Sequence, residues 1–319
     1  MYQPTEDDFD HPDPDVGYVD EDEEEIPMAE RELAEDAQWK LIQKNTFTRW
    51  ANEHLKEKNF VVEDLQFDLA DGLKLIALVE SLSNQKFKHV NKRPSFRTQK
   101  LENVTMVLRF LEESEGLRLV NIDSTDIVDC RIKLILGLIW TLILHYSITM
   151  PLWEGEEDHG ANGPTPKQRL MAWLNNKLPN DKPVKNFTTD WNSGIAIGSL
   201  VDSCAPGLCP DWRSWKPKEN FRNAKEAMDA AEQWLDVPQL IRPEEMTSAH
   251  VDEKAMMTYL SQFPSAKLKN GAPLRPKSNP ELLHGNTVGN PAKFTIDAHS
   301  AGRGNVEVIV LNPKGQREN

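Results

Sequence analysis

The most apolar part of the chain is residues 134–144, LILGLIWTLIL, and no Asp, Glu, Lys or Arg occurs between Leu134 and Trp153. A membrane-spanning helix needs about 20 predominantly apolar residues. Here the strongly apolar run covers 11 residues, turns polar from His145 onward and meets Pro151. Because a helix that is apolar on every side can also be the centre of a helical domain, we predict a buried core helix rather than a membrane anchor.

Elsewhere, apolar residues recur at three- and four-residue spacing, which is the pattern of amphipathic helices. One such face consists of Trp39, Ile42, Thr46, Phe47, Trp50 and Ala51. A second helix is predicted to open at the capping box Thr165-Pro-Lys-Gln168, which has proline at the first helical position. Residues 101–111 and 224–235 predict two further helices. The pattern therefore indicates a mainly α-helical protein.

The chain also repeats itself at an offset of 120 to 123 residues. Residues 71–82, DGLKLIALVESL, match residues 193–204, SGIAIGSLVDSC. The flanking matches are Trp50 with Trp173, Asn103 with Asn223, and Lys133 with Lys254. A period of this length indicates a duplicated domain rather than a solenoid of short units. The counterpart of the apolar helix is residues 255–260, AMMTYL, and a run this short supports the core-helix prediction.

Changes in composition divide the chain into six segments. We predict an acidic disordered tail over residues 1–35, helical domains over 36–148 and 164–266, an acidic linker over 149–163, a Pro/Gly-rich linker over 267–290, and a β segment over 291–319. Residues 294–298 and 306–310 alternate as strands do, with a glycine-containing turn between them. Because two strands are not stable alone, the β segment either belongs to a larger β-domain or relies on something outside this chain.

The formal net charge of −14 is concentrated in the tail, since residues 1–36 hold 16 acidic side chains and one basic side chain. Such a composition cannot bury enough apolar surface to offset chain entropy, so we expect disorder. An acidic tail does not favour nucleic acid, and it excludes a secretory signal or a mitochondrial presequence. We therefore expect a cytoplasmic location. Cys130, Cys204 and Cys209 form no CxxC pair and have no histidine cluster nearby, which predicts reduced thiols and no metal site.

Two longer stretches resemble the paired signatures of actinin-type actin-binding domains. They are residues 43–52, QKNTFTRWAN, and residues 119–140, LVNIDSTDIVDCRIKLILGLIW. With the duplication, they give the chain a resemblance to the tandem calponin-homology region of filamins over about residues 36–264. Residues 203–212, 258–264 and 271–276 are similar to filamins as well. Residues from about 291 resemble the start of a filamin immunoglobulin-type repeat that follows a hinge.

This resemblance implies a mainly α fold class, with two tandem calponin-homology domains followed by a partial immunoglobulin-like β segment. It implies non-catalytic binding to the side of filamentous actin in the cytoplasmic actin cytoskeleton, without a cofactor, within a crosslinking scaffold. The first domain would make the main contact and the second would support it. Full filamins dimerise through a carboxy-terminal repeat that this chain lacks, so one chain alone is expected to decorate filaments without bundling them.

In this family, three segments are implicated in the contact, here residues 39–50, 121–140 and 165–178. Filamentous actin is acidic, so basic and apolar side chains suit its surface. The actin-binding candidates are Trp39, Lys40, Lys44, Arg49, Asn121, Ile122, Asp123, Arg131, Lys133 and Trp140. Trp39 is equally suited to a packing role, and the basic run Lys86–Lys100 is either a binding surface or an ordinary solvated loop.

The third segment also offers candidates for anionic phosphoinositide head groups, as in some relatives. They are Lys167, Arg169 and Lys177. Basic residues near an anionic membrane contribute about 1 kcal/mol each, so three would give only marginal attraction.

Two departures from the family pattern bear on the site. Cys130 stands where the second signature usually has glycine, so the turn before the apolar helix could differ in geometry. The second domain lacks this signature and reads HVDEKAMM over residues 250–257. This difference fits a main contact on the first domain.

No sequence feature predicts an enzyme. A Gly-rich phosphate loop and a GxSxG motif are both missing, and Asp123, Asp126 and Asp129 lack the glycine and final glutamate of a calcium loop. The alternatives to actin binding are a regulatory scaffold or microtubule-linked adaptor, and a membrane-anchored protein. We also expect the acidic linker to let the two domains separate and expose the actin-binding face of the first.

Overall fold

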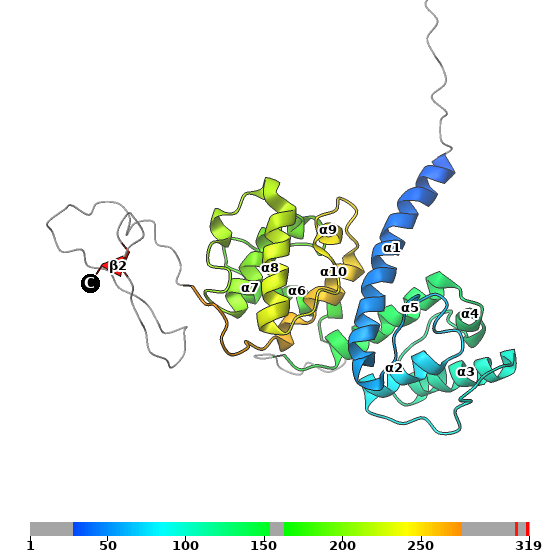
Figure 1. The fold of residues 1–319 in the computed structure, drawn as a ribbon. Coiled ribbons are helices and arrows are strands. Elements are labelled where there is room, and N and C mark those ends of the chain that lie inside the picture. The colour runs from blue at the N-terminus through cyan, green and yellow to red at the C-terminus, as the bar shows by residue number, and fades with distance from the viewer. Residues whose placement is uncertain (1–27, 154–162, 276–309, 312–316, 319) are drawn as a thin grey trace, which may run out of the picture. The chain divides into compact units, whose positions relative to one another are not determined.

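The computed structural model describes residues 28–153, 163–275, 310–311 and 317–318 (Figure 1). The first domain contains α1 (Met28–Leu55), η1 (Lys56–Lys58), α2 (Leu73–Ser83), α3 (Arg97–Glu113), α4 (Ser124–Val128), α5 (Ile132–Ile143) and the π-helical η2 (Leu144–Thr149). The second contains α6 (Pro166–Lys177), η4 (Thr189–Trp191), α7 (Ile195–Cys204), η5 (Trp212–Ser214), η6 (Pro217–Glu219), α8 (Asn220–Leu235), α9 (Pro243–Met246), α10 (Glu253–Leu260) and η7 (Phe263–Ser265). By its contacts, the chain separates into Met1–Ala37, which includes the start of α1, and Gln38–Asn319, which includes both domains.

Helix α5 and its extension η2 form the apolar segment that the sequence analysis singled out. Among the described residues, the stretch Ile132–Thr149 is long and apolar enough to cross a membrane by length and composition alone. However, Ile135, Leu138, Ile139, Leu142 and Ile143 are each 0% exposed within the first domain. The segment is therefore a core helix, as predicted.

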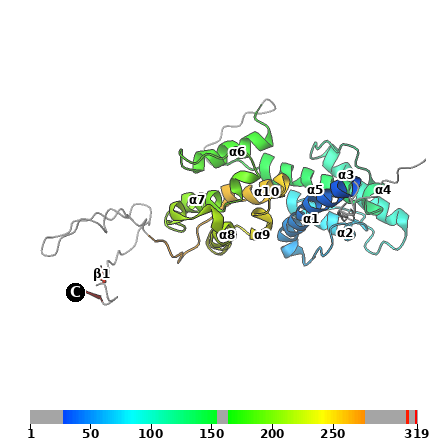
Figure 2. The same ribbon diagram turned by 90° about the horizontal axis from the view of Figure 1, so that it is seen from above.

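The asparagine that repeats between the two domains makes equivalent hydrogen bonds in each. Asn103 on α3 donates to the carbonyl oxygens of Asp71 (3.0 Å) and Asn91 (3.1 Å). Its counterpart Asn223 on α8 donates to the carbonyl oxygens of Ser193 and Lys216, both at 2.9 Å. Each buried asparagine thus fastens the loop before one helix to the next helix. In the second domain these helices, α7 and α8, lie side by side in both views (Figures 1 and 2).

A glycine lets the two helices approach in each domain. Gly72 (φ 80°) and Gly194 (φ 73°) precede α2 and α7 in the left-handed conformation. A Cβ atom on Gly72 would lie 2.6 Å from Cβ of Asn103, and one on Gly194 would lie 2.4 Å from the amide nitrogen of Ala224. These contacts are too short for any side chain, so both positions require glycine.

Helix α1 begins earlier than expected. Residues 28–35 were predicted to be part of the disordered tail, but α1 starts at Met28. The segment reads MAERELAE, and these residue types favour helix strongly. Residues 1–27 of the predicted tail lie outside the described residues.

Both predicted linkers begin with residues that pack on a domain. At the first, Trp153 is 4% exposed and meets Trp173 edge to face at 6.2 Å between ring centroids. At the second, the amide nitrogens of Lys267, Lys269 and Arg275 donate to the carbonyl oxygens of Leu235, Trp234 and Gly207 at 3.0, 2.8 and 2.7 Å. We call residues 267–275 the strap. Residues 154–162 and 276–290 lie outside the described part.

Within the predicted β segment, the structure describes two short strands. β1 (Val310–Leu311) and β2 (Arg317–Glu318) pair antiparallel, with Val310 opposite Glu318. The predicted strand 294–298 lies outside the described residues, as does the predicted strand 306–310 except for Val310. The mainly helical fold class is therefore confirmed, whereas the immunoglobulin-type segment is not.

Candidate functional site

The second signature, residues 119–140, folds as a short helix followed by a turn and α5. Asp123 caps α4, where its carboxylate accepts from the Thr125 amide at 2.8 Å. Hydrogen bonds from the backbone and hydroxyl of Thr125 hold the pKa of Asp123 below its ordinary value. Ile122 packs against the core, while Asn121 is exposed and adopts a positive φ of 56°. The start of the signature is therefore fixed by capping and packing.

Cys130 occupies the turn between α4 and α5. Its φ of 57° lies in the left-handed region that glycine adopts freely. The turn geometry therefore follows the glycine-like conformation, although a non-glycine residue loses about 1 kcal/mol there. Gln66 supports the turn, because its amide nitrogen donates to the Cys130 carbonyl at 3.0 Å.

Two basic candidates follow this turn directly. The guanidinium of Arg131 pairs with the buried Asp126 at 2.9 Å, yet 63% of the Arg131 side chain stays exposed. Lys133 is exposed and has no ion pair within the residues that the structure describes. Both charges therefore face solvent at the start of α5, where an acidic partner can reach them.

Trp140, at the other end of the signature, is half-buried. Its ring stacks on Phe47 of α1, with 6.2 Å between centroids and an interplanar angle of 6°. The ammonium group of Lys254, on α10 of the second domain, lies 5.7 Å from the Trp140 ring centroid. Trp140 thus joins the core of the first domain to a cation of the second.

The candidates on α1 have different environments. The Lys40 ammonium lies 5.5 Å from the Trp39 ring centroid, and both side chains are half-buried. Lys44 pairs with Asp64 at 2.8 Å within the first domain. Arg49 instead reaches the second domain, where it donates to both carboxylate oxygens of Glu245.

Arg49 is the centre of a polar contact between the domains, which we call the latch. Its guanidinium lies 2.7 and 3.2 Å from the Glu245 oxygens and 2.8 Å from the Leu240 carbonyl. The amide of Asn45 donates to Glu245 at 3.1 Å. Burial alone would raise the pKa of Glu245, but the hydrogen bonds from Arg49 and the Arg242 backbone outweigh it and lower this pKa. Glu245 is therefore ionised in the latch at neutral pH.

A second polar contact lies beside the latch. Gln43 donates from its amide to the carboxylate of Asp252 at 3.0 Å. The same carboxyl group caps α10 by accepting from the Ala255 amide at 2.8 Å. Burial raises the pKa of Asp252, and these hydrogen bonds only partly counter that effect.

The phosphoinositide candidates on α6 are each engaged in a different way. Lys167 pairs with Glu253, and the Lys177 ammonium lies 5.7 Å from the Trp173 ring centroid. Arg169 donates to the carbonyl oxygens of Ile148 (2.6 Å), Thr149 (2.8 Å) and Pro151 (2.5 Å). Its guanidinium also lies 4.3 Å from the Trp153 ring centroid. Arg169 therefore holds the chain where it leaves the first domain.

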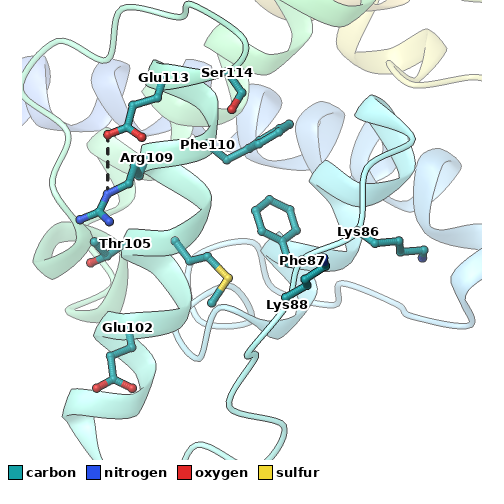
Figure 3. Close-up of a pocket in the computed structure, with 10 residues that line it drawn as sticks. Lys86, Phe87, Lys88, Glu102, Thr105, Arg109, Phe110, Glu113 and Ser114 are labelled. Atoms are coloured by element: carbon teal, nitrogen blue, oxygen red, sulfur yellow. Dashed lines mark ion pairs between the residues drawn. The ribbon is translucent and has the colours of Figure 1, made fainter.

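A pocket that the sequence did not indicate lies between α3 and residues 86–88, which begin the basic run Lys86–Lys100 (Figure 3). Its volume is about 500 Å³. Phe87 and Phe110 meet edge to face in its wall, with 5.2 Å between centroids. Lys86, Lys88 and Arg109 stand at its edge, and Arg109 faces Glu113 at 3.8 Å. The mixed charges of this edge do not favour one class of ligand.

The calponin homology (CH) domain family matches residues 41–148 and 164–269. The chain belongs to this family and carries two of its domains in tandem. The chain is 59% identical to Filamin-A of Drosophila melanogaster over 301 residues, which is 91% of this chain and 14% of that protein. It is 55% identical to Filamin-C of Mus musculus over 314 residues, which is 95% of this chain and 11% of that protein. These matches confirm the filamin resemblance, although the chain spans only a small part of the filamins' length.

More distant relatives share the tandem region. Alpha-actinin-1 of Homo sapiens is 34% identical over 237 residues, which cover 73% of this chain and 25% of that protein. The crystal structure of the actin-crosslinking core of Schizosaccharomyces pombe fimbrin is similar, with a TM-score of 0.56 and 18% identity. This similarity covers 71% of the present chain and 48% of the fimbrin chain. At that identity it supports the fold alone.

Proposed function

We propose that this tandem module binds the side of filamentous actin without catalysing a reaction. The first domain makes the main contact and the second supports it, as part of a filamin-type crosslinking scaffold in the cytoplasmic actin cytoskeleton. The fimbrin core of similar fold is described as actin-crosslinking. The filamin and actinin relatives support the same class of function.

The observation that carries this proposal is a difference between equivalent positions of the two domains. Arg131 and Lys133 correspond to Asp252 and Lys254 at the offset of 121 residues. In the second domain both positions contact the first domain, through Gln43 and Trp140. In the first domain both basic side chains face solvent. The first domain therefore presents a basic surface to a partner, while the second uses the same surface internally.

Co-sedimentation of the full 319-residue chain with filamentous actin tests the proposal. We expect micromolar binding that Lys133→Glu weakens about tenfold, and that Arg131→Glu with Lys133→Glu weakens further, because like charges then face actin. The control is Lys216→Glu with Lys218→Glu, which makes the same charge change at exposed positions of the second domain. It should leave binding nearly unchanged.

The outcomes separate the competing functions. If wild type fails to pellet with actin at micromolar concentration, the proposal is wrong. Pelleting with microtubules but not with actin would favour the adaptor alternative. Circular dichroism of each variant must match wild type, because Arg131→Glu also removes the partner of the buried Asp126.

A further inference from the structure

Two large aromatic side chains of the first domain are exposed beside the Cys130 turn. Phe67 is 58% exposed and Phe96 is 70% exposed. Exposing a phenylalanine side chain to water is unfavourable in free energy. Groups of exposed apolar residues commonly mark interaction sites. Neither residue belongs to the two signatures, and only Phe96 lies in a stretch that the sequence pattern indicated, the basic run Lys86–Lys100.

Hydrogen bonds tie the neighbours of both phenylalanines to the same turn. Gln66, next to Phe67, donates to the Cys130 carbonyl at 3.0 Å. Arg97, next to Phe96, donates to both carboxylate oxygens of Asp129 at 2.8 and 2.9 Å. Asp129 and Cys130 directly precede Arg131. Both exposed phenylalanines are therefore next in sequence to residues that contact the turn before the basic residues at the start of α5.

The backbone holds both phenylalanines in place. Phe96 is the amino-terminal cap residue of α3, and its amide donates to the Gln99 side-chain oxygen at 3.2 Å. The Phe67 amide donates to the Asp64 carbonyl and its carbonyl accepts from the Ala70 amide, each at 3.2 Å. Apolar side chains on a fixed backbone lose little conformational entropy on binding, which suits interface anchors.

The second domain does not repeat this surface. At the local offsets of the duplication, 122 and 120 residues, Phe67 corresponds to Thr189 and Phe96 to Lys216. The core positions around them are preserved, as the pair Asn103 and Asn223 shows. A core requirement would therefore apply to both copies. Only the domain with the solvent-facing basic pair carries the two rings.

We infer that Phe67 and Phe96, whose sequence neighbours contact the Cys130 turn, are apolar anchors of the contact with filamentous actin. This inference rests on the proposed function and extends its site beyond the two signatures. Arg131 and Lys133 supply charge complementary to acidic actin, and the rings supply apolar area that leaves water on binding. Phe96 also lies within the basic run Lys86–Lys100, which places part of that run at the contact.

The test measures actin affinity by co-sedimentation for Phe67→Ala, Phe96→Ala and the double variant of the full chain. Each single change should weaken binding about tenfold and the double change more, as expected for interface anchors. The matched control is Phe221→Ala, because Phe221 is a 44% exposed phenylalanine near the start of α8 in the second domain. Its affinity should stay within about twofold of wild type.

Thermal unfolding of the same variants decides between an interface role and a packing role. Lost affinity with an unchanged Tm supports the inference. Wild-type affinity in the double variant overturns it, and so does a loss of affinity that parallels a large fall in Tm. A wild-type chain that does not bind actin would contradict the proposed function itself, so the two failures are distinguishable.

Discussion

His54, near the end of α1, is enclosed by the first domain. Its imidazole meets the Trp50 ring edge to face, with 4.8 Å between centroids. Burial disfavours the charged form and lowers the pKa of His54 from 6.5 to about 4. The unfolded chain therefore binds more protons than the folded chain between these two pH values.

This difference predicts a loss of stability in mild acid. The contribution of His54 is fully present above about pH 6.5, declines as the pH falls towards 4, and then changes no further. The full loss amounts to about 3 kcal/mol. Urea unfolding at pH 7 and pH 4.5 should show a smaller pH effect for His54→Gln than for wild type. The control is His250→Gln, because His250 is exposed. If His54→Gln showed the same pH effect as wild type, the loss of stability could not be assigned to His54.

At the residue scale, sequence showed which side chains could bind but not which were already engaged. The exposure of Lys133 agrees with its place in the first turn of an apolar helix, α5. The engagement of Arg49 could not be foreseen, because its carboxylate partner Glu245 is 196 residues away. Arg169 is similar, since its three acceptors are backbone carbonyls that no side-chain pattern reveals.

At the element scale, the approach of α2 to α3 depends on Gly72. Gly72→Ala should destabilise the protein by at least about 3 kcal/mol, because the new Cβ meets Asn103 at 2.6 Å and φ is 80°. The control is Gly116→Ala, which has a similar φ of 67° but no atom within 4 Å of the new Cβ. That change should cost about 1 kcal/mol. If urea unfolding shows the same loss of unfolding free energy for Gly72→Ala and Gly116→Ala, backbone strain and not helix packing would explain why position 72 requires glycine.

Local signals predicted helix starts better than helix interactions. The capping box at Thr165 is present as expected, since the Gln168 amide donates to the threonine hydroxyl at 3.3 Å. The start of α1 could not be predicted from composition, because the acidic side chains of residues 28–35 also belong to residue types that favour helix. The glycine and asparagine pairs were visible only as repeat matches, and their contact needed coordinates.

At the scale of the whole molecule, the latch predicts control of actin affinity by the second domain. Glu245→Gln should weaken the contact between domains by about 1 to 3 kcal/mol, because it removes the charge that Arg49 pairs with. If the closed arrangement covers part of the actin-binding face, actin affinity should rise. Co-sedimentation measures this effect. Equal actin affinities for the variant and wild type would refute the regulation of actin binding by the second domain.

The choice of residue matters, because Arg49 is also an actin-binding candidate. Changing Glu245 leaves the first domain intact, and a double-mutant cycle with Arg49→Ala isolates their coupling. The control is Asp181→Asn, which weakens the bidentate pair with Arg213 inside the second domain at 2.8 and 3.2 Å. That change should leave actin affinity unaltered.

The duplication was the strongest signal for the whole molecule. It predicted two helical domains, and the described helices form two such domains. It could not predict the contact between them, because the latch residues Arg49 and Glu245 have no repeat pattern of their own. Their pairing depends on tertiary geometry across the linker.

The strap sets how the second domain would carry mechanical load. A pull on the chain beyond Arg275 would act first on its hydrogen bond to Gly207, and then on the bonds of Lys269 and Lys267 to α8. Bonds loaded one after another yield at lower force than bonds loaded together. The strap would therefore detach at a lower force than the core helices. Its detachment would protect the helical core of the second domain from unfolding under tension.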